Sequence, residues 1–146
     1  MIRNIFSILC REAITDQETN SVSYIHCIEE GATLKLPTII PSVFLGTLWE
    51  KVGDDEILYS VRVVLASPSG KERLLLQTKE LVFNRSRQRL HFKLDKLNIN
   101  EFGRHEIRVY FRVKGTWRIA SRLPFLIRQL APQKAKQSAV EMTEMY

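Results

Sequence analysis

Apolar and charged residues alternate along the last third of the chain, and this alternation limits the folds that are open to it. Residues 104–113 read Arg-His-Glu-Ile-Arg-Val-Tyr-Phe-Arg-Val, so every second side chain is apolar or histidine. Side chains of an extended strand point to opposite faces in turn, and the pattern therefore predicts a strand with one buried and one solvated face. Strands of this kind are typical of antiparallel sheets.

Eight segments with strand-like patterns, separated by turn signals, predict an all-β chain. They span residues 4–14, 22–30, 42–51, 57–66, 73–83, 88–95, 104–113 and 117–127. Ser67-Pro68-Ser69-Gly70 is a strong turn signal, because proline presets the second position of a β-turn. We expect one antiparallel β-sandwich domain, immunoglobulin-like or C2-like, over residues 1–128, followed by a polar and flexible tail over residues 129–146.

The same alternation predicts which side chains face the core. In the first segment Phe6, Ile8, Cys10 and Ile14 share a face. The expected inward residues of four later segments are Val43, Leu45, Thr47 and Trp49; Leu90, Phe92 and Leu94; His105, Ile107, Val109, Phe111 and Val113; and Trp117, Ile119, Leu123, Phe125 and Ile127. The opposite face of residues 104–113 then carries the charged side chains.

Composition agrees with a single globular domain. The 146 residues are 45% hydrophobic and 26% charged, which argues against wholesale disorder. The two cysteines, Cys10 and Cys27, are too few for a disulfide scaffold. They lie nearly opposite each other if the first hairpin is symmetric, so a cross-strand disulfide is conceivable, but we favour two free thiols.

The chain carries no recognisable targeting segment. Its first apolar run, Ile5 to Cys10, is six residues long, shorter than the core of a secretory signal peptide. No apolar stretch approaches the length of a membrane span. We therefore expect a soluble cytoplasmic protein.

The run from Leu97 to Val109 resembles the crossover that precedes a late strand in immunoglobulin-like sandwiches. A tyrosine commonly closes that corner with a hydrogen bond, and here His105 stands in its place, two residues after Gly103. Over about residues 4–127, including the acidic loop 16–20, the chain resembles an uncharacterised bacterial family of short immunoglobulin-like or C2-like β-sandwich proteins. The resemblance implies a fold rather than an activity, because sandwiches host many unrelated functions.

Positive charge is concentrated where the alternation is strongest. Residues 85–128 contain twelve Lys and Arg against three acidic residues, whereas residues 1–84 contain eight basic and eleven acidic residues. A three-residue turn at 114–116 places Arg108 opposite Arg122 and, in the same register, Arg112 opposite Arg118. Like charges directly opposite each other in a sheet are unfavourable, so this face is a candidate anion or partner site. Its candidate residues are Arg104, Arg108, Tyr110, Arg112, Arg118 and Arg122.

The same face has an ordinary alternative. Arginine stems cover apolar surface on solvated faces, and acids such as Glu29, Glu30, Glu80 and Glu106 offer partners for the charges. Tyr110 is the one aromatic expected on this face, whereas nucleic-acid surfaces usually carry several for stacking. An immunoglobulin-like strand order would also put residues 88–95 in the opposite sheet and divide the charge between two surfaces.

No catalytic signature is present in the sequence. It has no Gly-rich phosphate loop, no Gly-x-Ser-x-Gly elbow, no His-Glu-x-x-His motif and no zinc spacing of cysteines and histidines. We therefore predict a non-enzymatic interaction module without metal or cofactor, which binds another protein through an edge strand or loops, or self-associates. The alternative is a binder of polyanions such as nucleic acid, through the arginine-rich face; no small-molecule substrate is indicated.

Overall fold

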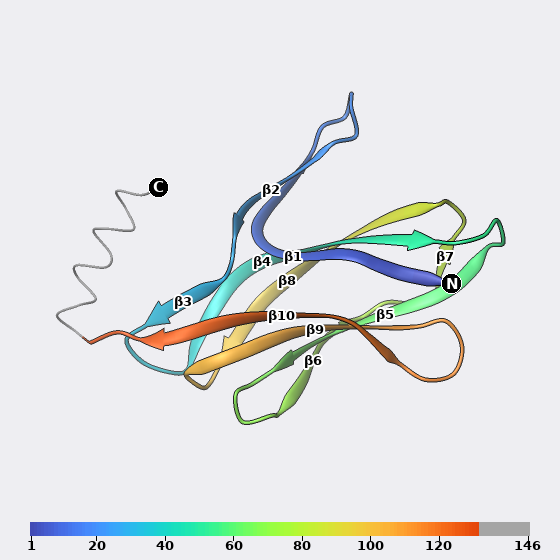
Figure 1. The fold of residues 1–146 in the computed structure, drawn as a ribbon. Helices are drawn as coiled ribbons and strands as arrows, with labels where there is room; N and C mark the ends of the chain where they lie inside the picture. The colour runs from blue at the N-terminus through green and yellow to red at the C-terminus, as the bar shows by residue number, and fades with distance from the viewer. Residues whose placement is uncertain (132–146) are drawn as a thin grey trace.

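The computed structural model describes residues 1–131, and its regular structure there is entirely β (Figure 1). The ten strands are β1 (Ile2–Thr15), β2 (Val22–Cys27), β3 (Glu30–Thr33), β4 (Thr38–Lys51), β5 (Ile57–Ala66), β6 (Glu72–Gln77), β7 (Leu81–Phe83), β8 (Arg87–Ile99), β9 (Gly103–Arg112) and β10 (Arg118–Gln129). The all-β class is confirmed. The expected tail starts inside β10, and its residues 132–146 lie outside the described part of the chain.

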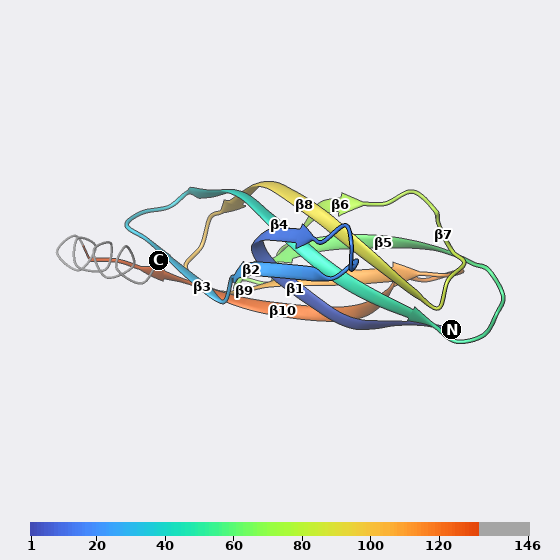
Figure 2. The ribbon, with the colours of Figure 1, turned by 90° about the horizontal axis from the view of Figure 1, so that it is seen from above.

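The strands form two sheets, seen from above in Figure 2. The four-stranded sheet has the order β2-β1-β4-β8, and the six-stranded sheet has the order β3-β10-β9-β5-β6, with β7 also pairing with β5. All pairs are antiparallel except β3 with β10. Strand β8 therefore lies in the opposite sheet from β9 and β10, so the basic stretch is divided between two surfaces.

One expected strand is divided in two, and strand β3 lies almost wholly outside the expected segments. Residues 73–83 form β6 and β7, and Thr78 between them bonds to Val61 of β5: its N–H donates to the Val61 carbonyl at 2.8 Å and its hydroxyl accepts from the Val61 N–H at 2.9 Å. Strand β2 ends at Cys27, which still pairs with Cys10 of β1 and follows His26, whose φ is 56°. The chain then crosses to the other sheet, where β3 pairs with β10.

One hydrophobic core lies between the sheets. Trp49 is its largest side chain, fully buried, with its ring centroid 5.8 Å from Phe111 and 6.2 Å from Tyr59. The indole N–H donates to the buried Thr47 hydroxyl at 2.8 Å, and that hydroxyl donates to the Leu90 carbonyl at 2.8 Å. The expected inward faces of β4, β8 and β9 are confirmed up to Phe111, whereas Val113 lies beyond β9 and is 38% exposed.

His105 supplies a hydrogen bond to the backbone, which the replacement of tyrosine by histidine had left open. It is 1% exposed, its Nδ1 lies 3.1 Å from the Gly103 carbonyl oxygen, and its ring stacks on Phe125. Its Nε2 is buried without a hydrogen-bond partner among residues 1–131. A carbonyl oxygen can only accept, so Nδ1 carries the proton and donates. The imidazole thus donates back to the chain two residues earlier.

Bulges overturn the expected inner faces of the first and last strands. In β1 the register shifts between Asn4 and Phe6, so Leu9 joins the core while Phe6 packs edge-on against Tyr24 and Ile14 is 46% exposed. In β10 the register shifts between Ile119 and Ser121. One extra residue reverses the sides that follow, so Phe125 and Ile127 are buried, as expected, but Ile119 is 39% exposed.

The hairpin of β1 and β2, which projects from the body in Figure 1, is anchored through Tyr24. The Tyr24 hydroxyl lies 3.0 Å from Nε2 of His91 on β8, and its ring packs edge-on against Phe6 and His91. A Cβ atom on Gly46 would come within 2.3 Å of the ring. The absence of a side chain at Gly46 therefore lets the hairpin sit on the four-stranded sheet.

Gly46→Ala is expected to weaken the packing of the β1–β2 hairpin on the four-stranded sheet. The added methyl must displace the Tyr24 ring, and we expect a loss of about 1 kcal/mol of stability, typical of a mildly overpacked site. Hydrogen exchange should accelerate in β2 more than in β4. In the double variant with Tyr24→Ala the clash has no partner, so the Gly46→Ala cost should disappear there; an unchanged cost would contradict the role given to Tyr24.

The cysteines occupy the register expected for them. Cys10 lies directly opposite Cys27, and both are free thiols, Cys10 buried and Cys27 exposed. Burial, and to a lesser degree the nearby Cys27, raises the pKa of Cys10 above its ordinary value. Among residues 1–131, no helical segment with the length and apolarity of a membrane span is found.

Candidate binding face

The structure brings five of the six predicted site residues together on one surface. Arg104, Arg108, Tyr110 and Arg112 project from alternate positions of β9, and Arg122 of β10 lies directly opposite Arg108, as the sequence predicts. The outward residues of β5 opposite them are Ser60, Arg62 and Val64, which pair with Arg112, Tyr110 and Arg108, and Ala66 pairs with Glu106. We call this outer surface of the six-stranded sheet the arginine face.

Arg118 is not part of the arginine face. The bulge in β10 pairs it with Phe111 rather than with Arg112. Directly opposite residues of an antiparallel pair point to the same side, and the Phe111 ring packs on Trp49 in the core. The expected pair of Arg112 with Arg118 is therefore wrong, because a bulge of one residue moved Arg118 to the other side of the strand.

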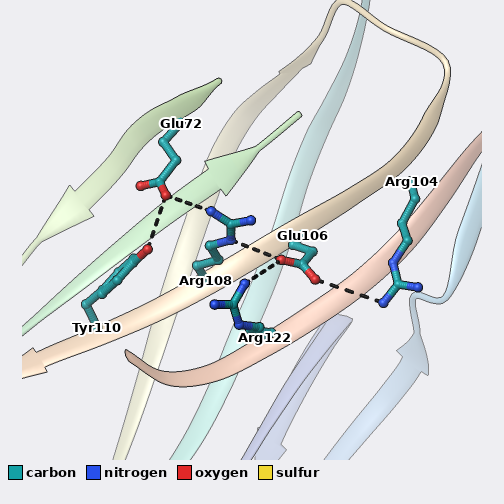
Figure 3. Close-up of polar contacts among 6 residues, drawn as sticks. All are labelled: Glu72, Arg104, Glu106, Arg108, Tyr110 and Arg122. Carbon is teal, nitrogen blue, oxygen red and sulfur yellow. Dashed lines mark hydrogen bonds and ion pairs between the residues drawn. The ribbon is translucent and has the colours of Figure 1, made fainter. Parts of the chain in front are cut away.

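Glu106 is the centre of the arginine face, as Figure 3 shows. Its carboxylate accepts from Arg108 Nε at 3.0 Å and from Arg122 Nη1 at 3.3 Å, and lies 3.9 Å from Arg104 Nη2. The side chain of Glu106 is 18% exposed, whereas those of Arg104 and Arg122 are 70% and 55% exposed. One carboxylate therefore holds three guanidinium groups that would otherwise repel one another.

The pKa values respond to this arrangement. The hydrogen bond from Arg108 is the largest cause that holds the pKa of Glu106 below its ordinary value. Burial opposes it as the second-largest cause, and the charge of Arg108 and the contact with Arg122 add smaller lowering effects. The hydrogen bond to Glu106 likewise raises the pKa of Arg108. Both groups are thus kept charged, and the network persists over the whole range in which carboxylates are ionised.

A second carboxylate extends the network to β6. Glu72 accepts from Arg108 Nη1 at 2.7 Å and from the Tyr110 hydroxyl at 3.2 Å. Arg108 is thereby fixed between two carboxylates, and its side chain is only 22% exposed. The sequence did not suggest this partner, because Glu72 reaches the face through the pairing of β6 with β5, and that neighbour cannot be deduced from local patterning.

Trp117 is a further residue of the arginine face that the sequence placed in the core. The guanidinium carbons of Arg62 and Arg112 lie 4.2 Å and 4.6 Å from the centroid of its indole ring. Arg62 also donates to the Gln77 side-chain oxygen at 3.1 Å. Cation–π contacts of this kind fix long side chains in place. The position of Trp117 next to a basic strand could have indicated this role. The alternation of residues 117–127 instead assigned Trp117 to the core.

Aliphatic side chains border the charged network. Val64 and Ala66 on β5 are only 4% and 3% exposed although they point outward, because the long side chains cover them. By contrast Leu74 on the edge strand β6 is 55% exposed, and Ile119 opposite Tyr110 is 39% exposed. The arginine face is therefore a mixture of fixed guanidinium groups, aromatic rings and exposed aliphatic side chains.

The side chains of the arginine face can form hydrogen bonds, ion pairs and apolar contacts. Within residues 1–131 no group of three or more histidine, cysteine or acidic side chains is placed to hold a metal ion. His105 is buried under the corner and His91 contacts Tyr24 on the other sheet, so neither imidazole lies on the arginine face. What the face presents to a partner is hydrogen-bond donors, two carboxylates and apolar surface.

No protein-family model and no curated protein sequence matches the chain. In fold the chain is similar to Pseudomonas fluorescens alkylpurine DNA glycosylase AlkC bound to DNA containing an abasic site analog, with a TM-score of 0.55 and 9% identity over 87% of this chain and 30% of that chain. The β-glucosidase from Listeria innocua aligns with a TM-score of 0.47 and 11% identity over 71% of this chain and 15% of its own. At such identities the likeness concerns the fold alone, and the family resemblance stays a prediction.

Proposed function

We propose that this chain is a non-enzymatic interaction module that binds another protein through the arginine face. We further propose that its two packed sheets form an immunoglobulin-like or C2-like sandwich, a view supported by the corner at Gly103 and His105. The outer surface of the six-stranded sheet, with Trp117 from the segment between β9 and β10, is then the binding element.

The main support is the set of side chains on this face. Arginine, tryptophan and tyrosine are the residues that most often dominate protein–protein binding energy. Here Trp117 contacts Arg62 and Arg112, and Tyr110 lies two residues before Arg112 on β9. The exposed side chains of Leu74 and Ile119 border this group. A mixed surface of this type fits a protein partner with both acidic and apolar groups.

The internal ion pairs add a second argument. Arg108 already shares the carboxylates of Glu72 and Glu106, so its orientation is set before any partner arrives. Ordering long side chains costs free energy at an interface, and side chains that are fixed beforehand avoid part of that cost. The same carboxylates would repel a phosphate backbone, which favours a protein over a nucleic acid.

Polyanion binding is the second candidate, and the exposed guanidinium groups support it. Five arginines against two glutamates leave the arginine face with a net positive charge, and Arg104 and Arg122 have exposed side chains. Nucleic-acid binding of this kind depends steeply on salt, because counterions are released from the backbone. A flat salt response in a gel-shift titration would exclude it.

The test uses Arg118 as a matched control, because it lies on the same strand as Arg122 but on the opposite side. Sedimentation of the purified chain first shows whether a second copy is the partner. Proteins that the chain retains in a pull-down after nuclease treatment and in high salt are then purified. Their affinity for the chain is measured by titration. We expect Arg112→Ala and Trp117→Ala to weaken the complex about tenfold or more, as hot-spot residues do, and Arg118→Ala to leave it unchanged.

Two results would count against a protein partner at this face. One is a monomeric chain from which no nuclease-resistant and salt-resistant complex can be purified. The other is an Arg118→Ala variant that binds as poorly as Arg112→Ala. Polyanion binding would instead be identified by a steep salt dependence that Arg122→Glu weakens and Arg118→Glu leaves nearly intact.

A further inference from the structure

A second concentration of positive charge lies on the four-stranded sheet, at the start of β8. A surface hollow of about 610 Å³ is lined there by Asn20, Leu48, Asn84, Arg85, Arg87 and Arg89, among others. The volume is in the range of small-molecule sites. The arginine face lies on the other sheet, so this β8 hollow is a separate feature.

The fold assembles the β8 hollow from three distant parts of the chain. Arg87 and Arg89 project from alternate positions of β8, opposite Glu50 and Leu48 of β4. Arg85 comes from the short link between β7 and β8, and Asn20 comes from the tip of the hairpin anchored by Tyr24. Arg89 donates to the Asn20 carbonyl oxygen at 3.1 Å, which fixes this guanidinium against the hairpin.

The charges around the β8 hollow are not balanced within the described chain. Arg85 has no hydrogen-bond or ion-pair partner among residues 1–131, and Arg87 reaches Glu50 only at 3.7 Å. Glu50 is already paired with Arg3 at 2.6 Å. By contrast the arginine face has carboxylates at its centre. Burial, and secondarily the charge of Arg89, lowers the pKa of His91, two residues further along β8.

Three guanidinium groups beside side-chain amides suit an anion with many oxygen atoms. Guanidinium groups bind phosphate oxygens through paired, charge-assisted hydrogen bonds. Alternate residues of a strand are about 7 Å apart, so an anion that reaches Arg87 and Arg89 together is better matched by linked phosphoryl groups than by one. We propose that the β8 hollow binds a small ligand that carries two or more linked phosphoryl groups.

Isothermal titration calorimetry with inorganic tripolyphosphate tests this site in the full chain. We expect binding that Arg85→Gln and Arg87→Gln each weaken about tenfold, the usual effect of losing a hydrogen bond between charged groups. Lys93→Gln is the matched control, because it removes the same charge from the same strand outside the hollow and should change affinity by less than about twofold. Orthophosphate should bind far more weakly than tripolyphosphate.

Comparison with ATP distinguishes the two sources of the phosphoryl groups. Equal affinity indicates a phosphate chain alone, and tighter binding of ATP indicates a nucleotide; either result supports the proposal. Amide resonances of residues 84–89 should shift on titration, which locates the site even if a variant fails to fold. No binding of tripolyphosphate, equal binding of orthophosphate, equal effects of Arg85→Gln and Lys93→Gln, or shifts confined to β9 would overturn it.

Discussion

Trp49→Ala is expected to lower the free energy of unfolding by about 3–5 kcal/mol, the usual cost of removing a large aromatic side chain from a core. Trp49 is fully buried between the sheets, where its ring contacts Tyr59 and Phe111. Its loss also leaves the buried Thr47 hydroxyl without its donor. Domains of this size are commonly stable by about 5–15 kcal/mol, so the variant should lie close to unfolding. Urea denaturation followed by circular dichroism measures the difference.

Trp117→Ala is the matched control for this experiment, because the chain has two tryptophans and the second lies on the arginine face. Its contacts with Arg62 and Arg112 should contribute only about 1 kcal/mol. Similar losses for the two variants would contradict the placement of Trp49 in the core and Trp117 on the surface. The pair also separates stability from binding, since Trp117→Ala is the variant expected to weaken the complex.

Glu106→Gln is expected to cost about 1.5 kcal/mol near neutral pH, because hydrogen bonds that join charged groups contribute more than neutral ones. Glutamine keeps an acceptor but removes the negative charge that holds Arg108, Arg122 and Arg104 together. The substitution should therefore loosen the side-chain orientations that a protein partner requires. Under the polyanion alternative it should instead increase affinity, since the arginine face gains one unit of positive charge.

The pH dependence gives this prediction a second measurement. The pKa of Glu106 is lower in the folded chain than in the unfolded one, so its stabilising effect is complete above the unfolded value. The effect is lost as pH falls through the lower, folded value. Wild type should thus lose its advantage over Glu106→Gln in acid, and the two unfolding curves should converge. Arg118→Gln is the control, which should change stability little at any pH; a constant difference between wild type and Glu106→Gln would contradict the network.

The alternating pattern predicted the all-β class, the core faces of β4, β8 and β9, and the pairing of Arg108 with Arg122, but it missed β3 and the break between β6 and β7. The prediction of core-facing side chains failed at bulges. One extra residue in a strand moves every following side chain to the other face, and the composition of the strand gives no sign of it. The bulge in β10 explains both errors on the arginine face: Arg118 was assigned to it wrongly, and Trp117 was left out.

Non-local neighbours were the other limit. Nothing in the sequence near Arg108 indicates that Glu72 will lie beside it, since their meeting depends on the order β9-β5-β6. The β8 hollow was missed for the same reason. Arginine alternates visibly from residue 85 to residue 89, but Asn20 joins it only because Gly46 leaves space for Tyr24 to hold the hairpin there.

The charge carried by β8 also bears on solubility. This strand of 13 residues ends the four-stranded sheet, and among residues 1–131 no strand pairs with its other side. Long bare edges invite aggregation by cross-chain pairing, and natural sheets counter this with cationic side chains. If two copies paired in parallel and in register along β8, Arg87, Arg89, Lys93 and Lys96 of each would lie opposite their counterparts across a gap of about 4.8 Å. Repulsion between these charges would disfavour such pairing, and less so as ionic strength rises.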